Sequence, residues 1–437
     1  MKNHRQTILM CLLVIICFIC LNGCYDNESD TPRVILSDSQ GRTFYDSSEG
    51  LAAQEYSAFV DIVSDEIKEI SLTDKKDTLY IKTTFNTEFQ KICAQAYEAS
   101  ALKNTPFASV ITSVDGRILC AFSGGSSDKN YTVEKTQPYS SVKPLSVYTP
   151  ALEKGTINWA STFVDSPVKQ TMSDDGVYED WPVNGNGYYT NKNTSIRDCI
   201  KYSLNTTAVR CLQDTGVAYC MDFISDKFGI DVKAEAERAA ISGEEEVLHN
   251  IGLGYLEKGV SPVDMAGYYQ IFATGGKYTA PFSILEITDK DGIVLYANES
   301  VAEAVISEET AYIMNALLRS PLERGGTAEM AYIEDVPLGG KTGTGTDYTG
   351  NWFVCFSPEY SVSIWHGRYT KNICTEIFSD ISEKLIFDKS KNYPECEKVK
   401  MRAYCEESGE GFSVNCSSLA SGYFVEGTTF DRCSLHS

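Results

Sequence analysis

The chain has 437 residues, of which 43% are apolar, and its formal net charge is -22. This composition supports a sizeable core and two or three domains of ordinary size, and it excludes wholesale disorder. A surface with this much negative charge repels phosphate backbones, and nucleic acid is therefore not an expected partner.

The first two dozen residues predict a targeting segment. A short basic start precedes an unbroken apolar run, 8–21, which has the length of a signal-peptide core and falls short of the roughly 20 residues that span a bilayer. The run ends in Leu21-Asn22-Gly23-Cys24, which resembles a bacterial lipobox. We therefore expect a lipoprotein-type signal peptide at 1–23 and a lipid anchor on Cys24, with an uncleaved helical anchor as the alternative. Either anchor would hold the protein at the extracytoplasmic face of the membrane.

Residues 24–77 are acidic and polar and indicate one helix around 51–70. This stretch predicts an acidic stalk or a small N-terminal region. From Thr78 the pattern becomes regular, because alternation over 78–84 predicts a strand and helical periodicity over 88–101 predicts a helix.

A hairpin is predicted next. Two β-rich runs, 107–114 and 117–122, are joined by Asp115-Gly116, a strong signal for a short turn. A long helical middle follows, from about 143 to 272, with Gly and Asn turns between its segments.

Two further strands are predicted near the end of this region, at 352–356 and 360–365, and an amphipathic helix at 373–386. Strands at both ends with helices between them indicate one α+β domain, 78–388, whose sheet is assembled from both chain ends and flanked by helices, with an all-helical lobe beside it. The remaining residues, 389–437, are a Cys-rich C-terminal extension.

A histidine-based hydrolase is not favoured. Outside the leader and the last two residues the chain has only His249 and His366, and no Gly-x-Ser-x-Gly elbow. We expect both histidines to be ordinary surface or core residues.

A lysine can activate a serine instead. Ser-x-x-Lys at a helix start places both side chains on one face, near the positive end of the helix dipole. The pattern occurs at Ser126/Lys129, Ser140/Lys143 and Ser166/Lys169. Only the second pair is followed by an apolar-periodic stretch, which begins at Pro144, a residue suited to a first helical turn. Ser140 is therefore the candidate nucleophile and Lys143 its candidate base.

Two later motifs strengthen this assignment. Ser203-Leu204-Asn205 lies in a predicted helical stretch, and Lys341-Thr342-Gly343-Thr344 precedes the strand pair. The ordered set Ser-x-x-Lys, Ser-x-Asn and Lys-Thr-Gly is a signature of serine acyltransferases.

From about 78 to 386 the chain resembles the penicillin-binding proteins, and among them the transpeptidase domain of the class A type. The resemblance extends beyond the three catalytic motifs. The further matching segments are 83–86 with Gln90, 137–144, 164–167, 203–210, 259–266, 324–328 and 351–354, and the tail from Cys405 to Cys433 is similar to the Cys-bearing extension of some Gram-positive members. The resemblance implies a five-stranded antiparallel sheet.

The chain departs from the family pattern at three positions. Tyr139 stands where the residue before the nucleophile is usually Gly, Gly345 where a second Thr is usual, and Cys355 where Gly is usual. Tyr139 is expected to narrow the cleft or shift acyl-donor specificity. Because the stretch before 78 is too short for a glycosyltransferase domain, we expect a protein that cross-links glycan strands and does not polymerise them.

The resemblance implies a role for each motif residue. Ser140 attacks a peptidoglycan stem peptide after neutral Lys143 takes its proton, Ser203 relays that proton to the leaving amine, and Asn205 orients Lys143. Lys341, Thr342 and Thr344, beside Gly343, hold the terminal carboxylate, and backbone amides of Ser140 and Thr344 form the oxyanion hole. β-Lactam antibiotics are expected to acylate Ser140. The alternatives are a D,D-carboxypeptidase, a serine β-lactamase, and a non-catalytic β-lactam sensor or scaffold.

No metal or organic cofactor is expected. Eleven of the fifteen cysteines lie beyond the leader and Cys24, and this odd number leaves at least one unpaired if the others form disulfides. No Cys-x-x-Cys pair is matched by a His pair, which argues against zinc.

Overall fold

The structure is a computed structural model that describes residues 32–49, 54–72, 77–172, 175–345, 350–368 and 372–436. The predicted signal peptide at 1–23 and the predicted lipid anchor Cys24 lie outside these ranges. Among the helices that are described, none combines the length and the apolar character needed to cross a bilayer.

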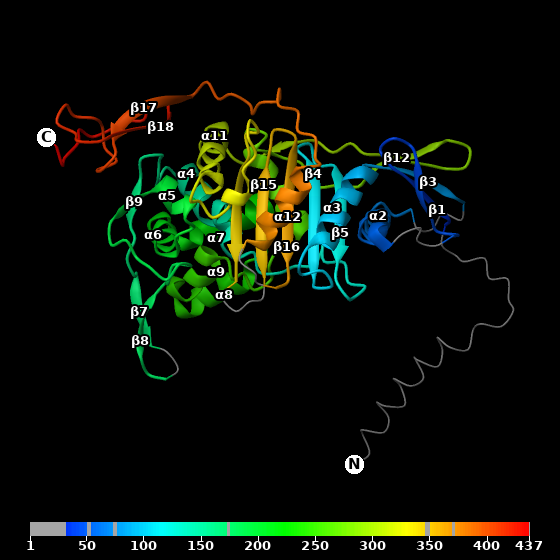
Figure 1. The fold of residues 1–437 in the computed structure, drawn as a ribbon, viewed down its shortest axis with the longest axis horizontal. Helices are drawn as coiled ribbons and strands as arrows, with labels where there is room; N and C mark the ends of the chain where they lie inside the picture. Colours follow the sequence, from blue (N-terminus) through cyan, green and yellow to red (C-terminus); the bar gives the residue numbers. More distant parts are fainter. Residues whose placement is uncertain are drawn as a thin grey trace, which may run out of the picture.

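A five-stranded sheet forms the centre of the molecule (Figure 1). Its order is β14-β15-β16-β4-β5, and every neighbouring pair is antiparallel. The strands are β4 (Phe107–Ser113), β5 (Ile118–Gly124), β14 (Gly339–Thr344), β15 (Asn351–Phe356) and β16 (Tyr360–His366). The predicted α+β class, with strands from both chain ends in one antiparallel sheet, is confirmed.

Side chains of β15 alternate between two cores. Trp352 and Val354 face the core of the helical lobe, whereas Phe353 and Cys355 face a second core under α3 (Thr87–Ala99) and α12 (Ile373–Ser382). This alternation follows from the two-residue period of a strand. Cys355, at a position where the family usually has Gly, is therefore a buried packing residue.

The helical lobe covers the other face of the sheet (Figure 1). Its helices are η2 (Tyr139–Val142), η3 (Pro144–Tyr148), α4 (Thr149–Glu153), α5 (Ile196–Lys201), α6 (Asn205–Thr215), α7 (Val217–Phe228), α8 (Lys233–Ser242), η4 (Glu244–Val247), α9 (Leu248–Leu253), α10 (Pro262–Tyr269), η5 (Gln270–Phe272), α11 (Glu308–Leu317) and η6 (Ser320–Leu322). The turn η7 (Glu329–Ala331) packs against α12 on the opposite face. Short strands interrupt the predicted helical middle: β6 (Thr162–Val164) pairs with β9 (Asn193–Ser195), and β7 (Lys169–Met172) pairs with β8 (Tyr178–Trp181).

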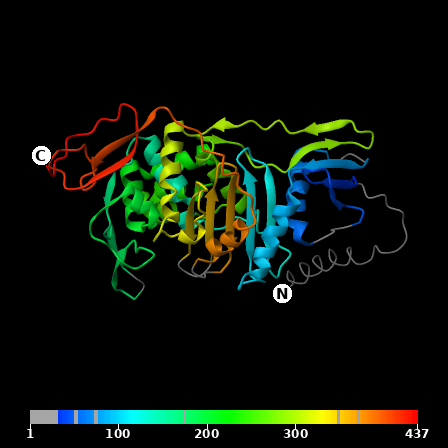
Figure 2. The same cartoon turned by 45° about the horizontal axis from the view of Figure 1, so that its top comes forward.

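The stretch predicted as an acidic stalk or a small N-terminal region is folded where it is described. Its elements are β1 (Val34–Ser37), β2 (Thr43–Asp46), η1 (Gln54–Tyr56) and α2 (Ser57–Glu69). Strands β1 and β2 belong to a second five-stranded sheet of order β12-β11-β3-β1-β2, in which β3 (Leu79–Thr83), β11 (Ile284–Thr288) and β12 (Val294–Ala297) come from beyond residue 77. Figure 2 shows β11 and β12, in yellow-green, beside the blue N-terminal strands. A boundary at 77/78 therefore cuts through this sheet.

The C-terminal extension packs against the helical lobe. Its hairpin consists of β17 (Val399–Cys405) and β18 (Leu419–Val425). The ring of Tyr423 lies edge-on to Trp159 at 5.2 Å and to Tyr312 of α11 at 5.3 Å, measured between centroids. A two-stranded pair, β10 (Lys277–Tyr278) with β13 (Glu303–Ala304), completes the described strands.

Candidate active site

Ser140 lies on the 3-10 turn η2 and Lys143 directly follows it as the C-cap, which differs from the α-helix start that the sequence predicted. The reason is Pro144, which has no N–H to donate to the Ser140 carbonyl in an α-helical bond. The N–H of Lys143 donates to that carbonyl instead. Side chains three residues apart eclipse each other in a 3-10 helix, so Ser140 and Lys143 share one face. Ser140 is partly exposed, whereas Lys143 is fully buried.

Tyr139 holds a backbone conformation that explains why Gly is usual before the nucleophile. Its φ is 50°, in the left-handed region that costs most residues free energy. Its N–H donates to the carbonyl of Gly254 at 2.9 Å, and a Cβ added at Gly254 would collide with the Tyr139 carbonyl. The loop after α9 therefore packs against the backbone just before Ser140 and hydrogen-bonds to it.

Lys143 contacts the Ser-x-Asn motif directly. Its Nζ donates to Asn205 Oδ1 at 2.7 Å and to the carbonyls of Ser203 and Leu204 at 3.2 and 3.3 Å. A neutral amine has two N–H groups and a lone pair, so one N–H can serve Asn205 while the two more distant carbonyls share the other. Lys143 would then retain a lone pair.

The Ser-x-Asn motif is a sharp turn between two helices. Helix α5 ends at Lys201 and α6 begins at Asn205, and Ser203 between them has φ 56°. This left-handed residue reverses the chain, so that the carbonyl of Ser203 faces Lys143 while its hydroxyl contacts Lys341.

Lys341 approaches the same turn from the sheet. It lies on edge strand β14, is fully buried, and its Nζ donates to Ser203 Oγ at 2.7 Å and to the Thr342 carbonyl at 2.9 Å. Since Ser203 Oγ accepts from Lys341, its own hydrogen remains to be donated elsewhere. The two lysines are thus linked through a single residue, Ser203.

Burial lowers the pKa of both lysines. Burial lowers the pKa of Lys143 well below its ordinary value, and the positive charge of Lys341 lowers it further. Burial lowers the pKa of Lys341 to about 7. Two causes lower the pKa of Lys143, whereas burial alone lowers that of Lys341, so Lys143 is the lysine more readily left as a neutral amine.

The remaining Lys-Thr-Gly residues border the nucleophile. A Cβ added at Gly343 would lie 2.9 Å from Ser141 N and would collide with the Pro138 carbonyl, so only Gly lets β14 approach η2. Thr342 donates its hydroxyl to Thr327 Oγ1 at 3.0 Å, and Thr344 is exposed. Hydroxyl groups therefore line the strand on both sides of Gly343.

Three residues that support Asn205 were given no role by the sequence analysis: Asp165, Val183 and Asn184. Asp165 is buried and accepts from Thr206 Oγ1 at 2.6 Å and from Asn184 Nδ2 at 2.7 Å. Asn184 Oδ1 in turn accepts from the N–H of Asn205 at 2.8 Å, and the Val183 carbonyl accepts from Asn205 Nδ2 at 2.6 Å. Burial raises the pKa of Asp165, but these and further hydrogen bonds outweigh burial and lower it overall.

This network fixes the amide of Asn205 so that its oxygen faces Lys143. Of the three supporting residues, only Asp165 could have been found from the sequence, because it lies in segment 164–167, which resembles the family. Asn184 and Val183 lie in a loop with no pattern of their own.

The other candidate groups lie elsewhere. Ser126 is exposed in a bend, and Ser166 accepts from Arg210 Nη2 at 3.1 Å, which gives it a structural contact. His366 is buried and pairs with Thr105 Oγ1 at 2.9 Å, while the exposed His249 stacks on Tyr255. The four residues of the site whose contacts interlock are Lys143, Ser203, Asn205 and Lys341.

Known proteins share both the sequence pattern and the fold. The family model "Penicillin binding protein transpeptidase domain" matches residues 85–382. Penicillin-binding protein 1A of Clostridium botulinum is 29% identical over 258 residues, which are 58% of this chain and 30% of that protein. Penicillin-binding protein 1F of Bacillus subtilis is 30% identical over 348 residues, which are 72% of this chain and 45% of that protein. The chain thus spans less than half the length of these curated relatives.

The fold likeness extends to lower sequence identity. The crystal structure of the D,D-transpeptidase domain of a peptidoglycan glycosyltransferase from Eggerthella lenta superposes with a TM-score of 0.65 at 15% identity, covering 82% of this chain and 98% of that one. The family match includes all three motifs described above, and the chain therefore belongs to the penicillin-binding protein transpeptidase family.

Proposed function

We propose that the chain is a serine D,D-transpeptidase that cross-links peptidoglycan stem peptides through an acyl-enzyme on Ser140, and that β-lactam antibiotics acylate the same serine. The observation that carries this proposal is the pair of buried lysines joined through Ser203, with Lys143 Nζ 2.7 Å from Asn205 Oδ1 and Lys341 Nζ 2.7 Å from Ser203 Oγ. Such an arrangement supplies a neutral base, a proton relay and a cation from three separate parts of the chain.

The first half-reaction acylates the serine. Lys143 takes the proton of Ser140 as its oxygen attacks the carbonyl carbon of the penultimate D-Ala. The tetrahedral oxyanion is stabilised by the backbone amides of Ser140 and Thr344. The C–N bond to the terminal D-Ala then breaks, and Ser203 passes a proton from Lys143 to the leaving amine. The ester on Ser140 is the product that remains.

The second half-reaction transfers the acyl group. An amine of a neighbouring stem peptide attacks the ester, its proton returns to Ser140 through Lys143, and a new amide is formed. During acylation Lys341 and the hydroxyls of Thr342 and Thr344 hold the carboxylate of the donor, a group that a D-Ala terminus and a penicillin share; the D-Ala carboxylate then departs with the leaving amine. If water replaces the amine, the same site acts as a D,D-carboxypeptidase.

Covalent labelling tests the proposal. The wild-type protein is expected to form an adduct with a fluorescent penicillin that survives denaturation in detergent, and Ser140→Ala is expected to form none. Ser126→Ala and Ser166→Ala, at the other two Ser-x-x-Lys patterns, are the matched controls and should label normally. Absence of wild-type labelling would contradict an acylating site of any kind, and labelling of Ser140→Ala would contradict the choice of nucleophile.

A second assay distinguishes transfer from hydrolysis. The protein is incubated with a D-Ala-D-Ala stem peptide and a D-amino acid as acceptor, and the products are separated by mass. Exchange of the terminal residue indicates acyl transfer, whereas release of D-Ala without exchange indicates a carboxypeptidase. Rapid, repeated hydrolysis of the penicillin itself would indicate a β-lactamase, and labelling without peptide turnover would indicate a sensor or scaffold.

A further inference from the structure

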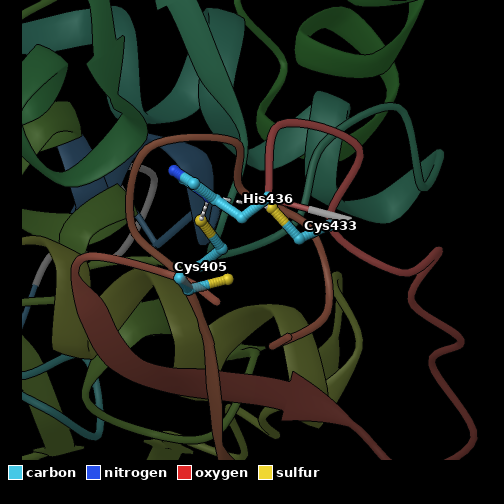
Figure 3. Close-up of side chains that lie close together, drawn as sticks. Cys405, Cys433 and His436 are labelled. Carbon is cyan, nitrogen blue, oxygen red and sulfur yellow. Dashed lines mark hydrogen bonds between the residues drawn. The ribbon is translucent and has the colours of Figure 1, made fainter. Parts of the chain in front are cut away.

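The C-terminal extension brings four metal-binding side chains together, far from Ser140 in sequence. Cys405 ends β17, Cys416 lies in the loop between β17 and β18, and Cys433 and His436 follow β18. Their sulfur and imidazole nitrogen atoms all lie within 4.8 Å of one another. Figure 3 shows the side chain of Cys405 close to those of Cys433 and His436, which come from one short segment after β18.

The spacing of these atoms suits a tetrahedral ion. His436 Nδ1 lies 3.2 Å from Cys433 Sγ and 3.5 Å from Cys405 Sγ. With zinc bonds of about 2.3 Å to sulfur and about 2.0 Å to nitrogen, the S···N edge of a tetrahedron is about 3.5 Å. The distances from His436 Nδ1 to Cys433 Sγ and Cys405 Sγ are therefore already close to those of a tetrahedral zinc site.

Outer contacts hold the ligands in this arrangement. Glu407 Oε2 lies 3.4 Å from His436 Nε2, on the side of the ring opposite Nδ1, as in the carboxylate–histidine pairs that orient zinc ligands. The N–H of Ser413 donates to Cys416 Sγ at 3.3 Å, and Ser408 Oγ lies 3.4 Å from Cys433 Sγ. Three of the four ligands thus have a partner that fixes their direction.

The extension also lacks the apolar core that would stabilise it alone. It contains one two-stranded hairpin, and its buried hydrophobic side chains other than cysteines are Val399, Tyr404 and Phe424. A single hairpin is marginally stable in water, and small modules of this size usually need a metal or disulfides. Cys405 and Cys433 are nevertheless fully buried.

We propose that Cys405, Cys416, Cys433 and His436 bind one Zn²⁺ ion as a closed, structural Cys₃His site. Four protein ligands fill a tetrahedral shell and leave no position for substrate, so the site is not catalytic. The proposal reverses the expectation of no metal. That expectation relied on the short paired spacing of common zinc motifs, whereas here the hairpin fold brings distant cysteines beside Cys433-x-x-His436.

The site would hold the hairpin in the form that docks on the helical lobe. Tyr423 of β18 contacts Trp159 and Tyr312, and Lys398, next to β17, forms a 3.0 Å ion pair with Glu309 of α11. Loss of the ion is therefore expected to release the extension from α11 before the central sheet unfolds.

Metal content of the full-length chain tests the proposal. The protein is purified with a reductant and without chelators, and zinc is measured by elemental mass spectrometry. One zinc per chain is expected for the wild type, with loss of most of it in Cys433→Ser and in His436→Ala. Cys396→Ser is the matched control, because Cys396 is a buried cysteine of the same extension outside the cluster, and it should keep the metal.

Cobalt provides a readout that does not depend on any variant folding. The wild-type protein, stripped of zinc with a chelator and titrated with Co²⁺, is expected to show thiolate-to-metal charge transfer and the intense visible bands of tetrahedral cobalt, which zinc then abolishes. Mass spectrometry of alkylated, unreduced protein identifies disulfides. Absence of zinc with two of the three thiols joined as a disulfide would overturn the proposal, as would octahedral cobalt or equal zinc loss in Cys396→Ser.

Discussion

Gly345 leaves room for the ring of Tyr139: a Cβ added at Gly345 would lie 2.7 Å from Cζ of Tyr139. The two positions are departures from the family pattern, and the structure joins them. The Tyr139 ring occupies space beside the end of β14, where it also packs edge-on against Tyr255 at 5.1 Å. The large side chain before the nucleophile and the missing side chain after Lys-Thr-Gly-Thr are therefore two halves of one packing arrangement.

We expect Tyr139 and Gly345 to be energetically coupled. Gly345→Thr should destabilise the protein by about 1–3 kcal/mol, because the new side chain collides with the ring. Tyr139→Gly removes a buried ring but relieves the positive φ, for a net cost of about 2–4 kcal/mol. The double variant should be more stable than the sum of the two costs predicts, by at least about 0.5 kcal/mol. Denaturant unfolding of all four proteins measures this coupling, and strict additivity would contradict it.

Asn205 is expected to set the protonation state of Lys143. Asn205→Asp preserves the shape but places a carboxylate at 2.7 Å from Nζ, which favours the ammonium form and removes the base. Penicillin acylation at neutral pH should fall by about 10²–10⁴-fold. Relative to the wild type at the same pH, the rate should recover partly as pH rises, because the raised pKa of Lys143 is then exceeded.

Asn205→Ala distinguishes the effect of the added negative charge from the effect of losing the hydrogen bond to Lys143. It removes the same hydrogen bond without adding a negative charge, so its rate should be reduced at every pH with no recovery at high pH. The quantity measured is the second-order rate constant of labelling across the pH range. Parallel pH profiles for the two variants would contradict an effect through the pKa of Lys143.

We expect the rate of acylation to fall above neutral pH, because Lys341 then loses its proton. Burial lowers its pKa in the folded protein to about 7, so the ammonium that holds the ligand carboxylate predominates below that pH and is lost as pH rises through it. The rate constant for acylation reports the free enzyme and should decline on this limb. Lys341→Arg keeps a positive charge at all these pH values, so its weaker activity should lack the decline. A decline at the same pH in Lys341→Arg would assign the titration to another group.

Gly343 is expected to tolerate no side chain. Gly343→Ala places a Cβ against the Pro138 carbonyl and 2.9 Å from Ser141 N, which forces β14 away from η2. Labelling should be lost, and unfolding free energy should fall by about 1–3 kcal/mol. Gly185→Ala is the control, because a Cβ there meets no atom within 4 Å and Gly185 has no positive φ. Equal labelling of both variants would show that the close approach is not needed.

Long, strongly patterned elements were predictable from the sequence, and short ones were not. The hairpin β4–β5, the strands β15 and β16, and the helices α3 and α12 follow the predicted runs within a few residues. Strands β1 and β2 have only four residues each and draw their core from β3 and β11 far along the chain. Local composition there is acidic and polar, so it indicated a stalk or a small N-terminal region.

The candidate active site was likewise predictable only in part. The motifs identified the residues that interlock, but not the conformations that aim them. The 3-10 turn at Ser140 is local, because Pro144 directly follows Lys143. The left-handed backbone of Ser203 and the orientation of Asn205 by Asn184 depend on contacts between separate segments. The cysteine cluster was missed for a similar reason, since its members meet only when the hairpin β17–β18 has formed.

The N-terminal sheet has a consequence for truncation. Strand β1 pairs in parallel with β3 over four residues, from Val34 against Leu79 to Ser37 against Lys82. A recombinant fragment that started at residue 78 would expose that edge of β3 and one face of Ile81 and Ile287, which α2 and Leu36 now cover. Such a fragment would be prone to self-association, so a soluble form for biochemistry is better begun ahead of Val34.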